Sequence, residues 1–145
     1  MSATNTFETA LLQHIFQNAD IALIGDASGL LGSAVDGNLY VSLHTGNPDE
    51  TGDQTTNECN YTSYARVAVS RTAGWDVTGN LASNAAEVTF PGATGGSNTA
   101  TYVGIGTASS GAGFLLCSFA LENPLAISDG VTPSFPAGDV YTSLD

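Results

Sequence analysis

Positive charge is scarce in this chain of 145 residues. It contains no lysine, its two arginines are Arg66 and Arg71, and 14 aspartates and glutamates give it a net charge of -12. Proteins that bind nucleic acid neutralise phosphates with Lys and Arg, and anionic membrane surfaces attract basic segments in the same way. The sequence therefore predicts neither a nucleic-acid partner nor a membrane partner.

Charge of either sign is also low, at 11% of residues, against an average of about 25%. Glycines, 17 in number, and many Ser, Thr and Asn residues take the place of charged ones. Hydroxyl and amide groups hydrogen-bond to a neighbouring protein at a smaller desolvation cost than charged groups do. This composition favours a protein that makes extended contacts with other proteins.

Long apolar stretches are missing as well. No apolar run approaches the length of about 18 residues that a membrane span needs. Residues 1–8 also lack the basic and apolar regions of a secretory signal. We therefore expect a protein made in the cytoplasm of the producing cell.

The two cysteines, Cys59 and Cys117, do not have the spacing of zinc, haem or thioredoxin-type sites. Cys117 lies in the apolar segment 114–119, which predicts a buried and inert thiol. Cys59 lies in a polar loop. A cytoplasmic origin favours free thiols, while the sequence leaves a bridge between the two cysteines open.

Residues near the start of the chain predict an amphipathic helix that ends near Asn18. Asn5 can cap this helix, and Glu8, three residues later, completes a pattern similar to a capping box. The apolar stripe consists of Phe7, Leu11 and Ile15, widened by Leu12 and Phe16. So short a helix is not stable alone, so we expect its stripe to pack on the rest of the domain or on a neighbour.

The remainder of the chain is typical of an all-β fold. Residues 20–38 predict a packed loop, and residues 83–86 and 91–100 predict backbone that lies at the surface or pairs with a neighbouring chain. Strands are expected at 39–44, 64–70, 87–90, 101–106, 113–121, 125–128, 131–135 and 140–144, with turns between them that include Asn123-Pro124. About eight strands indicate an antiparallel β-sandwich or jelly roll with one N-terminal α-helix. We expect one structural domain, made of a helix and packed arm (1–38) and a β-sandwich (39–145).

Residues that could carry chemistry are few and poorly spaced. His44 faces outward in the alternating pattern of its strand, and His14 lies on the polar face of the helix, so structural or surface roles are expected for both. The acidic residues Asp49, Glu50, Asp53 and Glu58 lack the order of a calcium loop, which favours a solvated acidic contact loop over residues 45–62. We expect no enzyme, no cofactor and no metal. The remote alternative, a small hydrolase, needs a pocket in which His44 meets two carboxylates.

Six residues are candidates for an interface: Phe7, Leu11, Ile15, Arg66, Arg71 and Trp75. In so acidic a chain Arg66 is expected to make a structural or interfacial charge-assisted bond. Trp75 and nearby tyrosines fit core or interface packing, or a platform for carbohydrate.

The order of the segments resembles a family of small tailed-bacteriophage virion accessory proteins. The segments that carry this resemblance are 11–16, 39–48, 64–69, 84–91, 101–105, 124–130 and 135–138. Members are labelled capsid cement or decoration proteins, or tail-fibre proteins. The resemblance implies a non-catalytic dimer or trimer on the capsid exterior, over junctions between subunits of the major capsid protein. The alternative is a tail or fibre component that binds host-surface glycan, and it predicts an exposed aromatic platform near Trp75.

Overall fold

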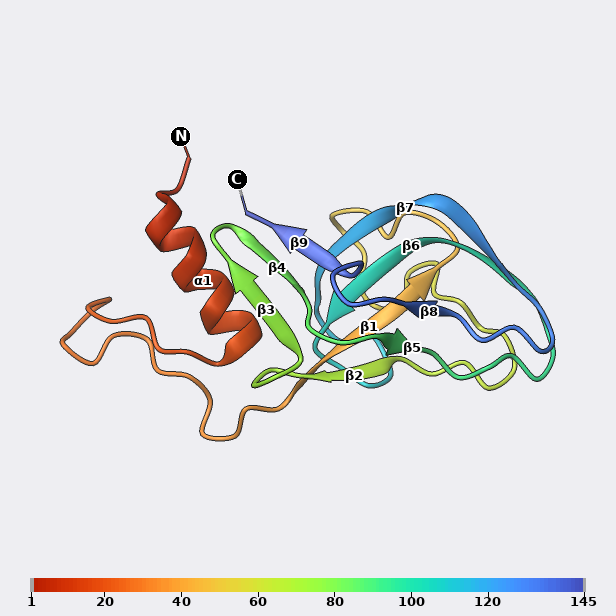
Figure 1. Cartoon of the computed structure of the whole chain (residues 1–145), viewed down its shortest axis with the longest axis horizontal. Coiled ribbons are helices and arrows are strands. Elements are labelled where there is room, and N and C mark those ends of the chain that lie inside the picture. Colours follow the sequence, from red (N-terminus) through yellow and green to blue (C-terminus); the bar gives the residue numbers. More distant parts are fainter. Residues whose placement is uncertain (1, 145) are drawn as a thin grey trace.

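The computed structural model describes residues 2–144, which form one α-helix and nine β-strands (Figure 1). The elements are α1 (Asn5–Gln17), β1 (Asn38–His44), β2 (Val67–Ser70), β3 (Trp75–Thr78), β4 (Leu81–Asn84), β5 (Val88–Thr89), β6 (Asn98–Gly106), β7 (Leu115–Ile127), β8 (Ser134–Phe135) and β9 (Tyr141–Ser143). Every strand pair within this range is antiparallel. The predicted all-β fold with an N-terminal helix is confirmed.

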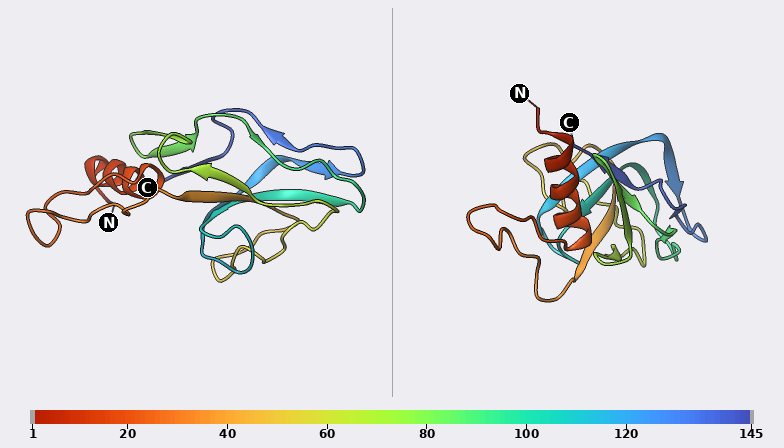
Figure 2. Two further views of the ribbon diagram at one scale, coloured as in Figure 1. Left: turned by 90° about the horizontal axis from the view of Figure 1, so that it is seen from below. Right: turned by 60° about the vertical axis from the view of Figure 1, so that its left-hand side comes forward.

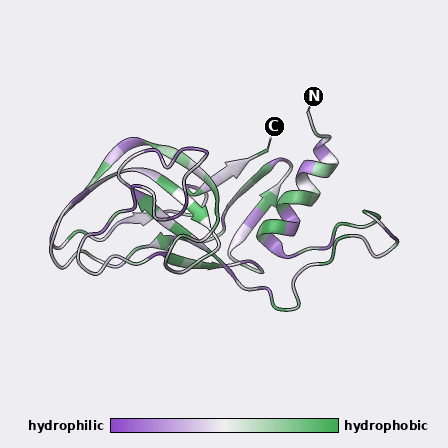
Figure 3. Cartoon of the chain, turned by 180° about the vertical axis from the view of Figure 1, so that it is seen from behind, coloured by the Kyte–Doolittle hydropathy of each residue, from purple (hydrophilic) through white to green (hydrophobic). Residues whose placement is uncertain are grey.

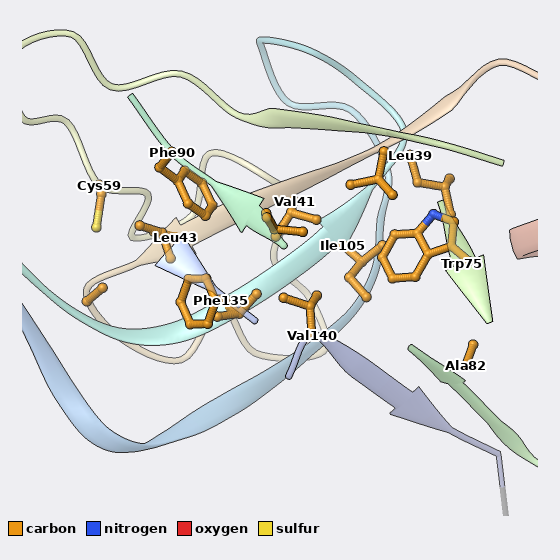
Figure 4. Close-up of a cluster of buried hydrophobic side chains, with 14 of the residues drawn as sticks. Leu39, Val41, Leu43, Cys59, Trp75, Ala82, Phe90, Ile105, Phe135 and Val140 are labelled. Atoms are coloured by element: carbon orange, nitrogen blue, oxygen red, sulfur yellow. The ribbon is translucent and has the colours of Figure 1, made fainter. Parts of the chain in front are cut away.

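The strands form two layers around one core. One layer is the sheet β2-β1-β6-β7, and the other consists of two small sheets, β3-β4-β9 and β5-β8. Side chains from both layers meet between them, among them Val41 and Ile105 from the large sheet and Trp75, Phe135 and Val140 from the opposite side (Figure 4). Loops cover the other face of the large sheet (Figure 2).

The helix packs on the β3-β4 hairpin. Phe16 meets Trp75 edge-to-face, with ring centroids 4.9 Å apart, and the Thr9 hydroxyl donates to Gly79 O. Leu12 and Phe16 of the predicted stripe are buried, together with Glu8, whereas Phe7 is exposed and Leu11 and Ile15 are half-buried, so the buried face is centred one residue along from Phe7, Leu11 and Ile15. The cap is also one residue from its predicted place.

Thr4, rather than Asn5, is the N-cap: its hydroxyl accepts a hydrogen bond from Phe7 N at 3.4 Å. Asn5 already has helical backbone. The C-cap is Asn18 in the left-handed conformation, which confirms the predicted end of the helix.

The β3-β4 hairpin corrects one expectation about pairing. Residues 83–86 were expected at the surface or against a neighbouring chain, but Ser83 lies in β4, opposite Asp76 of β3 and Tyr141 of β9. The hairpin turns through Gly79-Asn80, with Gly79 at φ +60°. A glycine at the first position of a two-residue turn fits the twist of a hairpin.

Strand β7 corrects a second expectation, which concerns the strands predicted at 113–121 and 125–128. It is one strand of 13 residues, where two strands separated by an Asn123-Pro124 turn were expected. Its register with β6 jumps from Ala120, opposite Tyr102, to Leu125, opposite Ala100. Residues 121–124 therefore form a bulge on the last strand of the sheet, and proline is tolerated there because its missing N–H breaks no ladder bond.

Candidate functional site

The outer face of strand β1 carries a buried polar cluster. Ser42 and His44 point away from the core, yet both are fully buried because the loop 45–62 folds over them. His44 Nδ1 lies 2.8 Å from Thr56 O, and His44 Nε2 lies 2.8 Å from Ser42 Oγ. A carbonyl can only accept, so Nδ1 carries the proton and Nε2 accepts from the Ser42 hydroxyl. Burial lowers the pKa of His44 and keeps the ring neutral.

This Ser-His pair has the hydrogen bond of a hydrolytic dyad without room for a substrate. Gly104 of β6 lies directly against it, and a Cβ at that position would lie 2.6 Å from His44 Nε2. A nucleophile must reach a reacting carbon, and here strand backbone fills that space. His44, which was expected to face outward, is therefore internal.

Glu58 and Arg66 form the strongest polar contact in the cluster. Arg66 donates from Nε to Glu58 Oε1 at 2.7 Å and from Nη2 to Glu58 Oε2 at 2.8 Å, while the Tyr64 hydroxyl donates to Oε1. Arg66 also donates to Ala108 O and Gly111 O. One guanidinium thus binds two loops, 45–62 and 107–114, to each other. The structural charge-assisted bond predicted for Arg66 is present, and its hydrogen bonds to Glu58 raise the pKa of Arg66.

The loop 45–62 is the solvated loop that its acidity predicted only in part, since Asp49 and Glu50 are exposed whereas its second half packs on the body. Gln54, Cys59 and Tyr61 are buried in it, and Glu58 is paired. Cys59 and Cys117 are free thiols, and burial raises the pKa of Cys59 to about 12. A thiol with so high a pKa is a poor nucleophile.

Two findings concern other classes of site. Within residues 2–144 no group of three or more His, Cys, Asp or Glu side chains is placed to hold a metal ion. In the same range no helix is long and apolar enough to cross a membrane.

Residues 19–37, here called the arm, project from the body beyond the end of α1 (Figures 1 and 2). Ile21 and Leu30 pair as an isolated β-bridge, and the Asp26 carboxylate accepts from Ser28 N and Gly29 N at the tip. The arm exposes large apolar side chains: Leu23 (78% exposed), Ile24, Leu30, Leu31 and Val35 (80% exposed). Figure 3, which colours the ribbon by hydropathy, shows hydrophobic stretches along the arm in green. The packed loop expected over residues 20–38 is therefore present only in part, since Ile21 is buried whereas Leu23, Leu31 and Val35 are 64–80% exposed.

Arg71 fixes the base of the arm. It donates to Ile15 O at 2.7 Å and to His14 O at 2.6 Å, carbonyls at the C-terminal end of α1, and also to Asp36 O. A cation is favourable at that end of a helix dipole. Asn18 adds hydrogen bonds with Ser33 N and the Asp36 carboxylate. The arm thus leaves the helix in a defined direction.

The candidate interface residues separate into two groups. Phe7 is exposed on the helix, and Leu11 and Ile15 are half-buried beside it. Arg66 and Arg71 bond within their own chain, and Trp75 is only 1% exposed. Trp75 is therefore not part of an exposed aromatic platform. The apolar residues of the arm were missed, and their one signal in the sequence is hydrophobicity without helical or strand period.

Nearly the full length of the chain matches a known family. A family model described as "Podophage GP4 fiber I protein gp80" matches residues 2–143. A search of curated proteins found no match.

Proposed function

The chain belongs to the podophage GP4 fiber I protein gp80 family, and on this basis we propose that it is a non-catalytic fibre subunit of the virion that attaches through its arm. The observation that carries the attachment is the row of exposed apolar side chains on a projecting segment with a fixed base. Clusters of exposed apolar residues on a soluble protein mark interaction sites. The closed Ser42-His44 pair favours a structural role over hydrolysis.

Charge selects the partner of the arm. The chain carries a net charge of -12, and its two arginines are engaged by Glu58 and by helix carbonyls of their own chain. Two identical copies therefore repel each other, and among residues 2–144 neither arginine is free to offset this repulsion. The partner that fits is another virion protein with an apolar groove rimmed by Lys and Arg. Pairing with a second copy as a dimer or trimer, or with the major capsid protein, stays a prediction.

Position in the particle tests the fibre assignment. We expect a cryo-electron microscopy reconstruction of the virion to show this fold in a fibre. Density for the fold over the capsid lattice and nowhere else would overturn the assignment and favour the capsid cement role predicted from the sequence.

Substitutions in the arm test the attachment. In phage that lack the gene, a complementing copy with Leu23→Ser, Leu31→Ser and Val35→Ser should enter particles at least about 100-fold less. Burial of each such side chain is worth about 1.5–3 kcal/mol, and about 1.4 kcal/mol is tenfold in affinity. The matched control, Leu81→Ser with Phe114→Ser, removes exposed apolar side chains outside the arm and should enter normally.

Two outcomes would contradict this attachment. Normal incorporation of the triple variant would show that the arm is not the contact. Self-association of the purified protein that is lost in the triple variant, measured by analytical ultracentrifugation, would make a second copy the occupant instead.

A further inference from the structure

A groove of about 400 Å³ lies where strand β7 passes strands β8 and β9. Its walls include Phe119, Glu122 and Asn123 from β7, Phe135 from β8, Asp139 from the turn before β9, and Tyr141 from β9. Small-ligand sites commonly have volumes of about 300–1,000 Å³. The groove therefore has the size to take a small ligand, and the strands β7, β8 and β9 that line it lie away from the arm (Figure 1).

The bulge in β7 shapes one wall of this groove. Between the register pairs Ala100–Leu125 and Tyr102–Ala120, residues 121–124 of β7 lie opposite the single residue Thr101 of β6. Bulges re-aim side chains and are frequent beside binding sites. Here the bulge presents Glu122 and Asn123 to the groove instead of to a regular ladder.

An aromatic surface and free polar groups both line the groove. The rings of Phe119 and Tyr141 stack with centroids 5.1 Å apart and an interplanar angle of 24°, and Tyr141 is 47% exposed. Within residues 2–144 the side chains of Glu122, Asn123 and Asp139 make no hydrogen bond or ion pair. Two carboxylates and one amide are therefore available to a ligand, beside an exposed ring.

We propose that this groove binds a pyranose unit of a neutral glycan. The C–H face of a sugar ring packs on an aromatic face, so the Tyr141 ring would carry that face of the ligand. Sugar hydroxyls donate to carboxylates in charge-assisted hydrogen bonds, which are about twice as strong as neutral ones. Glu122 and Asp139 supply such acceptors, and Asn123 supplies both a donor and an acceptor.

The same residues exclude other ligand classes. The lining of the groove contains no Lys, Arg or His, so a phosphate, sulfate or uronate would face two carboxylates without a counter-charge. The inference rests on the proposed fibre function in one respect only, which is that a fibre subunit is placed where it meets glycans of a host surface. Binding itself is a property of the isolated protein.

Saturation-transfer NMR on the purified full chain tests the groove directly. The probes are the methyl pyranosides of glucose, galactose, mannose, rhamnose and N-acetylglucosamine, followed by an array of neutral bacterial oligosaccharides. We expect a signal with at least one probe. Tyr141→Ala should weaken its binding at least about tenfold, and Glu122→Gln with Asp139→Asn should weaken it about threefold to tenfold.

Two variants serve as controls. Tyr141→Phe keeps the ring and should keep the binding, and Phe114→Ala removes an exposed aromatic ring outside the groove and should have no effect. Circular dichroism melts show whether each variant is folded. If Tyr141→Ala fails to fold, the double variant Glu122→Gln with Asp139→Asn tests the site instead, because both side chains are exposed.

Three results would overturn the proposal that the groove binds a sugar. They are no binding to any probe, binding that survives both the Tyr141 and the carboxylate variants, and binding of choline or spermidine without any sugar. None of them bears on the fibre assignment, which depends on the position of the protein in the particle. Conversely, sugar binding by a protein that is found only on the capsid would support the sugar site and contradict the fibre assignment.

Discussion

Replacing Glu58 by Gln should destabilise the protein severely, although it only exchanges one carboxylate oxygen for an amide nitrogen and removes the charge. The Arg66 side chain is 2% exposed, and Glu58 holds it through two hydrogen bonds of 2.7 and 2.8 Å. Removing one partner of a buried ion pair costs about 3–5 kcal/mol, because the other charge stays buried without compensation. Domains of this size have total stabilities of about 5–15 kcal/mol. We therefore expect a loss of about 3 kcal/mol or more, and a fall in Tm of about 10 °C.

Urea unfolding provides the measurement. Trp75, the only tryptophan, is buried against Phe16, so its fluorescence reports the packing of the helix, while circular dichroism reports the strands. The midpoint should fall with an unchanged m-value, since the folded surface is the same. Amide hydrogen exchange should increase in both loops that Arg66 joins, 45–62 and 107–114.

A double variant separates the ion pair from the packing around it. Glu58→Met with Arg66→Met removes both charges and should recover much of the lost stability, because apolar replacements of buried pairs are often neutral or stabilising. Recovery should be incomplete, since Ala108 O and Gly111 O lose their donor. A cost below about 1 kcal/mol for Glu58→Gln would refute the reasoning, because that is the value of a solvated pair.

Three further predictions concern the helix cap, the buried imidazole and the thiols. Thr4→Ala should lower the free energy of unfolding by about 0.5–1 kcal/mol, whereas Asn5→Ala should change it by less than half as much; the reverse order in urea titrations would restore Asn5 as the cap. The pKa of His44 is lowered in the folded state, so stability is constant above the unfolded pKa of about 6.5 and falls as the pH drops below it, by up to about 1.4 kcal/mol per pH unit. Urea titrations between pH 7 and 5.5 should show a weaker fall in His44→Gln, and equal slopes would contradict the assignment. Cys59, with a pKa of about 12, should not react with a thiol reagent at pH 8 until urea unfolds the chain, and rapid labelling of the native protein at this residue would show that the loop over it opens.

Local patterns predicted the helix and most of the strands, and long-range contacts determined which of their faces are covered. The period of four around Leu12 was sufficient for the helix, but Trp75 of the β3-β4 hairpin selects which stripe of that helix is buried. That hairpin was missed because each strand has only four residues, although Gly79-Asn80 between them is a hairpin signal.

The alternating pattern of β1 correctly assigned its residues to two faces. The same pattern could not predict that the loop 45–62 covers the face that carries Ser42 and His44. His44 was expected to be outward-facing because a period of two implies one buried face. Its burial depends on Arg66 holding Glu58, a contact across eight residues that no local pattern encodes. The groove depends in the same way on the register jump in β7, since Asn123-Pro124 predicts a turn unless the pairing on both sides is known.

The place of Pro124 on strand β7 affects what happens when many copies are crowded together. β7 is the last strand of the large sheet, and an unpaired strand edge is a template on which a further chain can add. The bulge over residues 121–124 interrupts that template in the middle, and Pro124 removes a donor from it. The continuous addition of strands from other copies is therefore blocked at this edge of the sheet. Copies that are crowded together must therefore associate through specific side-chain contacts and not by adding strands to β7.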